Sequence, residues 1–207
     1  MAIHTEQSVR PTRSIGNDFW NVPNQLTTLR FILSVVLFAF LSLEFYLTSL
    51  VLFIIAAGTD WIDGYWARKY GQVTTLGRIL DPFVDKIIIC GTFILLGSIQ
   101  RSGVWAWMAV VIVGRELLVT ALRSFLEQQG TDFSANLSGK VKMVLQCFAA
   151  GTSLFVLHYA QHFNGPEQAV PDWMRYLLTA SVWAAVLSTI QSGIGYIVVA
   201  LRLLRQG

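Results

Sequence analysis

The sequence predicts an all-α polytopic membrane protein with six transmembrane helices and both termini in the cytoplasm. Three observations predict this class. Of 207 residues, 54% are hydrophobic and 13% are charged, and the mean hydropathy of +0.56 is too apolar for a water-exposed surface. Six apolar stretches are each long enough to cross a bilayer core of about 30 Å. The basic residues are also divided unequally between the connections.

The six predicted spans follow one another along a single domain of residues 26–207. The spans cover Leu26–Leu43, Leu47–Ala67, Pro82–Ile99, Val104–Leu126, Val141–Ala160 and Met174–Leu204. The last is longer than the roughly 20 residues that a span needs, so we expect it to protrude from the membrane. Residues 1–25 form a polar cytoplasmic segment without the apolar run of a secretory signal peptide. Within that segment, Asp18–Asn24 has the mixed composition of a short interfacial helix.

The orientation follows from the connections between the spans. Six spans place both termini on one side, and the termini, connections and adjoining parts of the spans on that side carry thirteen of the fifteen Lys and Arg residues. The opposite side carries only Arg101 and Arg175. Basic connections stay in the cytoplasm, which predicts cytoplasmic termini in a cell inner membrane. Four aromatic residues flank the opposite ends, as interfacial anchors do: Trp105, Trp107, Trp173 and Tyr176.

Other features of the composition exclude some functions. Cys90 and Cys147 both lie in apolar runs, so neither a disulfide framework nor a cysteine metal site is expected. The net charge of +3 comes from scattered basic residues, which predicts no nucleic-acid partner. The pair His158 and His162 has a chelating spacing, but we interpret both as exposed loop histidines on the non-cytoplasmic side.

Four aspartates at the second and third spans are the strongest functional signal. Asp60 and Asp63 are three residues apart, and Asp81 and Asp85 are four apart, so each pair lies on one face of its own helix. Sequential spans joined by about a dozen residues are antiparallel, so both pairs can meet at the cytoplasmic end. Ionisable groups in a span cost at least a few kcal/mol each, which indicates a function.

Four ionised carboxylates repel one another unless cations lie between them, and two divalent ions would balance their charge. Oxygen ligands alone favour Mg²⁺ or Mn²⁺, and two such ions recur in phosphoryl transfer. The alternative is a set of salt bridges to Arg68, Arg78 and Lys86. Salt bridges would not need Gly64, Ala67 and Gly77 beside the acids, whereas a nucleotide needs the room that small residues leave.

This segment resembles the signature of the CDP-alcohol phosphotransferases. Eight positions match at set intervals over 26 residues: Asp60, Asp63, Gly64, Ala67, Arg68, Gly77, Asp81 and Asp85. The hydropathy profile agrees with the six-span fold of that family over nearly the whole chain.

The resemblance implies a role for each matched residue. The four aspartates would hold two divalent metal ions, Mg²⁺ or Mn²⁺, and Asp85 would also be the general base. The CDP site would be lined by Asp63, Gly64, Ala67, Arg68 and Gly77. The implied reaction is attack by an acceptor hydroxyl on the β-phosphorus of a CDP-linked donor, which releases CMP.

The acceptor is predicted from basic residues of the fourth and fifth spans. Arg115, Arg123 and Lys140 are candidates for binding a phosphate on the acceptor, although the positive-inside rule also explains basic residues there. Segments around Asn24 and Thr28, Arg115 and Lys140 are similar to bacterial phosphatidylglycerophosphate synthases. That similarity implies CDP-diacylglycerol and glycerol 3-phosphate as substrates. Asn24 and Thr28 are either cavity-lining residues or helix caps.

Several alternatives remain at the level of sequence. The same donor could serve a cardiolipin, phosphatidylserine or inositol-lipid synthase, and intramembrane acids also occur in ion or proton transporters. A structural scaffold would leave the aspartates unexplained. The resemblance also implies a homodimer in contact with membrane lipids. Gly193 and Gly195 indicate close helix packing, either within one chain or between two.

Overall fold

The structure is a computed structural model, which describes residues 22–70, 75–128, 137–162 and 170–204. Its described residues form six α-helices and no strand: α1 (Val22–Ser42), α2 (Tyr46–Tyr70), α3 (Thr75–Ser98), α4 (Ala106–Gln128), α5 (Leu137–His162) and α6 (Asp172–Leu204). Each predicted span coincides with one helix, so the all-α class is confirmed. The predicted interfacial segment begins outside the described residues, and its last three positions belong to α1.

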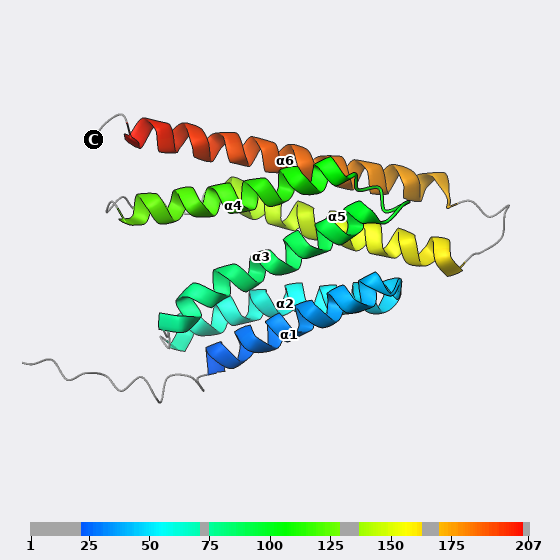
Figure 1. The fold of residues 1–207 in the computed structure, drawn as a ribbon, viewed down its shortest axis with the longest axis horizontal. Coiled ribbons are helices and arrows are strands. Elements are labelled where there is room, and N and C mark those ends of the chain that lie inside the picture. Colours follow the sequence, from blue (N-terminus) through cyan, green and yellow to red (C-terminus); the bar gives the residue numbers. More distant parts are fainter. Residues whose placement is uncertain (1–21, 71–74, 129–136, 163–169, 205–207) are drawn as a thin grey trace, which may run out of the picture.

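The helices form an elongated bundle in which α3 has a central place (Figure 1). It contacts α1 and α2 on one side and α4 and α5 on the other, while α6 packs on α4 and α5. Successive helices run in opposite directions, so α1 begins and α6 ends at the same end of the bundle (Figure 1). The end of α2, the start of α3, the end of α4 and the start of α5 lie at that end too.

The distribution of side chains is that of a membrane protein. Large apolar residues are exposed on every helix, among them Ile32, Ile54, Ile94, Val110 and Val144. Polar side chains are buried between the helices instead: Ser34, Ser49, Thr92, Gln146, Ser153 and Thr189 are at most 1% exposed. Exposed apolar surface on all sides suits lipid. The Gln146 amide donates a hydrogen bond from α5 to the Thr189 hydroxyl of α6, whereas Ser34 and Ser49 donate to nearby backbone carbonyls of their own segments. By length and composition alone, Gly139–His162 and Asp172–Arg202 could each cross a bilayer.

A tight turn between α3 and α4 fixes helices at the other end of the bundle. Between α3 and α4, Gly103 has a φ of +74°, and a Cβ there would lie 2.8 Å from Leu178 of α6. The Ser102 carbonyl in the same turn accepts a 2.6 Å hydrogen bond from the Ser153 hydroxyl of α5. The turn is therefore attached to two later helices, and this sets the position of α4 along the bundle.

Candidate active site

The signature residues lie on α2 and α3. Asp60 and Asp63 belong to the C-terminal half of α2, and Asp81 and Asp85 to the N-terminal half of α3. These two helices contact each other, and the two halves lie at the same end of the bundle (Figure 1). The side chains of all eight signature residues fall outside the described part of the structure. The backbone is consistent with the expected arrangement, and convergence of the carboxylates stays a prediction.

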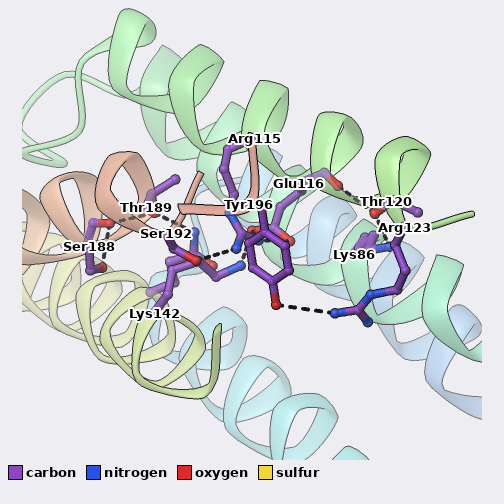
Figure 2. A network of polar contacts seen from close by, with 12 residues as sticks. Lys86, Arg115, Glu116, Thr120, Arg123, Lys142, Ser188, Thr189, Ser192 and Tyr196 are labelled. Atoms are coloured by element: carbon purple, nitrogen blue, oxygen red, sulfur yellow. Dashed lines mark hydrogen bonds and ion pairs between the residues drawn. The ribbon is translucent and has the colours of Figure 1, made fainter. Parts of the chain in front are cut away.

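A second group of polar residues lies between α4, α5 and α6, and we call it the cationic cluster (Figure 2). It consists of Arg115, Glu116 and Arg123 of α4, Lys142 of α5, and Ser192 and Tyr196 of α6. All but the two arginines are buried as whole residues, and the arginines are half-buried. The cluster is therefore built into the helix bundle rather than displayed on its surface.

Glu116 is the anion of the cationic cluster. Its carboxylate accepts a hydrogen bond from the Lys142 ammonium and lies 3.4 Å from the Arg115 guanidinium. The side chains of Glu116, Arg115 and Lys142 are 10%, 9% and 6% exposed. Buried charges of this kind are tolerated when they are paired, so one carboxylate allows two cations to lie in the bundle.

Two residues one turn apart on α6 contact the arginines. The Arg115 Nη2 donates a 2.5 Å hydrogen bond to the Ser192 hydroxyl, and the Arg123 Nη2 donates a 3.4 Å bond to the Tyr196 hydroxyl. Both guanidinium groups also lie near the Tyr196 ring, with their Cζ atoms 5.4 Å and 6.0 Å from its centroid. Such distances permit cation–π attraction, which grows in a desolvated site.

Two N–H groups of the arginines have no acceptor among the described residues. The Nε atoms of Arg115 and Arg123 are both buried and have no hydrogen-bond partner among the described residues. A buried N–H without an acceptor costs about 1–3 kcal/mol, so these donors are suited to an anionic ligand. Arginine binds phosphate and carboxylate groups through paired N–H donors.

The cluster is connected to the signature helix α3. Lys86, which directly follows Asp85, donates a hydrogen bond to the Thr120 hydroxyl of α4. That hydroxyl in turn donates a 2.6 Å bond to the backbone carbonyl of Glu116. The backbone positions of Asp85 and of the cationic cluster are therefore linked through two hydrogen bonds, visible at the right of Figure 2.

The predicted acceptor-site residues lie in different surroundings. Arg115 and Arg123 meet at Tyr196. Lys140 is exposed in the first turn of α5, and the lysine in the described cluster is Lys142. Thr28 is exposed on α1, whereas the Asn24 side chain lies outside the described residues.

The sequence interpretation assigned no site role to Glu116, Lys142, Ser192 and Tyr196. A helical face of small and polar residues could have identified Lys142 and Ser192. On α5, Lys142 begins a buried face that continues through Gln146 and Ser153. On α6, Ser192 and Tyr196 continue the buried face of Thr189.

The two histidines His158 and His162 lie within helix α5 rather than in a loop. They were expected in an external loop, but His158 and His162 lie in the last two turns of α5, with ring centroids 6.0 Å apart. Helix α5 extends past the predicted end of its span because polar residues can continue a helix beyond the apolar region. Among the described residues, no three His, Cys, Asp or Glu side chains gather around a common point.

Fold, apolar exterior and buried polar groups together define a helical membrane protein with a cationic cluster between α4, α5 and α6. A family model described as CDP-alcohol phosphatidyltransferase matches residues 20–202, so the chain belongs to the CDP-alcohol phosphatidyltransferase family of phosphotransferases. This membership favours the enzyme over the transporter and scaffold alternatives.

Curated relatives share one name, CDP-diacylglycerol–glycerol-3-phosphate 3-phosphatidyltransferase. The relative from Bacillus subtilis (strain 168) is 40% identical over 151 residues, which cover 73% of this chain and 72% of the relative. The relative from Haemophilus influenzae is 30% identical over 190 residues, covering 87% and 94%. The relative from Rickettsia bellii is 33% identical over 183 residues, covering 85% and 93%.

Proposed function

We propose that the protein transfers the phosphatidyl group of CDP-diacylglycerol to sn-glycerol 3-phosphate, giving phosphatidylglycerophosphate and CMP. Family membership and the shared name of the relatives support the donor and the reaction class. The observation that supports a phosphorylated acceptor is the pair Arg115 and Arg123, whose buried Nε atoms have no hydrogen-bond partner in the described part of the chain, on the helix that packs against α3. Serine, inositol and other acceptors without a phosphate would leave those donors unsatisfied.

Donor binding is assigned to the signature residues of α2 and α3. Gly64, Ala67 and Gly77 leave room for the nucleotide, and Arg68 and Asp63 complete the CDP site. The four aspartates, Asp60, Asp63, Asp81 and Asp85, would hold two divalent ions, and four carboxylates on two contacting helices fit Mg²⁺ or Mn²⁺. When bound, the ions neutralise charge on the pyrophosphate of the donor.

The acceptor is held by its phosphate and activated at its hydroxyl. Arg115 and Arg123 bind the phosphate, and Lys140 in the first turn of α5 attracts it. Asn24 and Thr28 of α1 line the cavity that holds the substrates. The Asp85 carboxylate takes the proton of the acceptor hydroxyl, and the oxygen attacks the β-phosphorus of the donor. A new phosphorus–oxygen bond forms, the bond to the bridging oxygen breaks, and CMP leaves with the electron pair.

The proposal includes the membrane topology. All six helices cross the inner membrane, with both termini and the signature at the cytoplasmic face, where soluble acceptor and lipid donor can both reach them. The thirteen-to-two division of basic residues supports this orientation. A homodimer remains part of the proposal on the strength of the resemblance.

The test uses purified protein in mixed micelles with CDP-diacylglycerol, Mg²⁺ and labelled glycerol 3-phosphate. We expect CMP release coupled to labelled lipid, and loss of both with a chelator or in Asp85→Asn. Glu44→Gln, a change in the turn between α1 and α2, serves as a matched carboxyl control that keeps activity. Turnover with serine or inositol but not with glycerol 3-phosphate would overturn the assignment of the acceptor. A folded protein that is inert towards every CDP-linked donor would overturn the proposed reaction.

A further inference from the structure

One face of α6 holds the arginines of α4 in place. Ser192 and Tyr196 are four residues apart, so they project from the same side of the helix. Both are buried, at 3% and 4% exposed, and each accepts a hydrogen bond from one arginine. No signature residue lies on α6, so the family motif gives this face no role.

The arginines need such support because they carry like charges. Arg115 and Arg123 are eight residues apart on α4, which is about 12 Å along the helix. The Tyr196 ring lies between their guanidinium groups and within 6.0 Å of both (Figure 2). The electron-rich face of the ring attracts both cations, and its hydroxyl accepts from Arg123. One side chain therefore sets the orientation of two cations.

Neighbouring contacts on α6 restrict the arrangement further. A Cβ on Gly193 would lie 3.2 Å from the Arg115 Cγ, so the stem of this arginine passes directly over the glycine. The Tyr196 hydroxyl also lies 3.5 Å from the Cβ position of Gly139, at the start of α5. Tyr196 is thus enclosed by α4 and α5, and its ring has little freedom to move away from the arginines.

We infer that Tyr196 is a positioning residue that sets the affinity for the phosphate of the acceptor by holding Arg115 and Arg123 in their binding orientation. This inference rests on the proposed function. It assigns to Tyr196 a role in recognising phosphorylated acceptors, with no part in donor binding or in the proton transfer at Asp85. Without the ring, the two guanidinium groups repel each other and adopt other rotamers, and the phosphate loses a preformed site.

The test compares wild type with Tyr196→Leu, Tyr196→Phe and the matched control Tyr176→Leu, which changes a 75% exposed tyrosine of the same helix. We expect Tyr196→Leu to raise the KM for glycerol 3-phosphate by about tenfold. The KM for CDP-diacylglycerol and kcat should stay within about twofold, because only acceptor binding is affected. Tyr196→Phe keeps the ring but loses the hydroxyl that accepts from Arg123, so its KM for glycerol 3-phosphate should lie between those of wild type and Tyr196→Leu. Tyr176→Leu should lie near wild type.

Two further measurements separate positioning from a general structural role. The inhibition constant of inorganic phosphate should rise in Tyr196→Leu in parallel with the KM. In a double-mutant cycle, Tyr196→Leu should cost less in the Arg123→Gln background than in wild type, because part of its effect acts through Arg123. The inference would be overturned if the effects of Tyr196→Leu and Arg123→Gln on the KM were additive. It would also be overturned if Tyr196→Leu lowered kcat while both KM values stayed unchanged.

The same experiment separates this inference from the proposed function. If the wild-type protein does not use glycerol 3-phosphate, both the assignment of the acceptor and this inference are overturned. Active wild type with an unaltered KM in Tyr196→Leu overturns the inference alone. If Tyr196→Leu does not fold, Tyr196→Trp decides instead: it retains a ring but misplaces it, and an acceptor KM equal to that of wild type would count against positioning.

Discussion

Replacing Glu116 by Gln tests whether the cationic cluster is held together by its single carboxylate. The change keeps the size of the side chain and removes its charge, which deprives Arg115 and Lys142 of the carboxylate that pairs with both in the described part of the chain. Breaking a buried ion pair in this way costs about 3–5 kcal/mol. For a chain of this length, about 1 kcal/mol corresponds to about 2–4 °C, so we expect the unfolding midpoint to fall by about 6–20 °C.

The control is Lys142→Met, which leaves Glu116 with Arg115 at 3.4 Å and should cost about half as much. The double variant should be more stable than Glu116→Gln alone, because only Arg115 then remains and it keeps its bond to Ser192. Thermal unfolding in micelles, followed by circular dichroism, measures all four proteins. A midpoint for Glu116→Gln within about 1 °C of wild type, or strictly additive losses, would refute the reasoning.

Two glycine substitutions test the packing that surrounds the cluster and the turn. Gly193→Ala places a Cβ 3.2 Å from the Arg115 Cγ and should raise the KM for glycerol 3-phosphate about two- to fivefold, whereas Gly195→Ala, with no atom within 4 Å, should not. Steady-state kinetics of both variants decide this, and equal values would show that Arg115 adjusts freely. Gly103→Ala forces a side chain into a φ of +74° and to within 2.8 Å of Leu178, so it should cost about 2–4 kcal/mol in thermal unfolding. An unchanged midpoint for Gly103→Ala would contradict the described turn.

Hydropathy predicted where the helices lie but not where they all begin and end. The third span was predicted to start at Pro82, yet α3 begins at Thr75 and continues through the proline. Residues between Thr75 and Asp81 include polar and small side chains, which lower hydropathy without ending a helix. Pro82 lies in the third turn, where it removes one backbone donor while the rest of the helix is retained. The length of the apolar stretch therefore corresponds to the membrane core. Helix α3 is longer than this stretch, and the additional residues lie at its N-terminal end, where the signature lies.

Prediction of the acceptor site depended on which face of each helix turns inward. Lys140 and Lys142 are both basic and two residues apart, which is a rotation of about 200° around the helix. Charge alone does not distinguish them. The buried face of α5 does, since it runs from Lys142 through Gln146 and Ser153 and excludes Lys140. Tyr196 was missed for a different reason: an aromatic residue in an apolar span is typical of lipid contact, and its contacts with α4 depend on tertiary structure.

The charges of the cationic cluster bear on the choice of acceptor. Glu116 is paired with Arg115 and Lys142, and Arg123 lies on the other side of Tyr196, so these four side chains carry a net charge of +2. A phosphate monoester carries about −1.5 to −2 at neutral pH, which nearly balances that charge. A neutral acceptor such as serine or free inositol would leave the net charge uncompensated inside the bundle, where repulsion is little screened. Glu116 therefore has two effects: it stabilises the cluster before the acceptor arrives, and it reduces the excess charge to what one phosphate can neutralise.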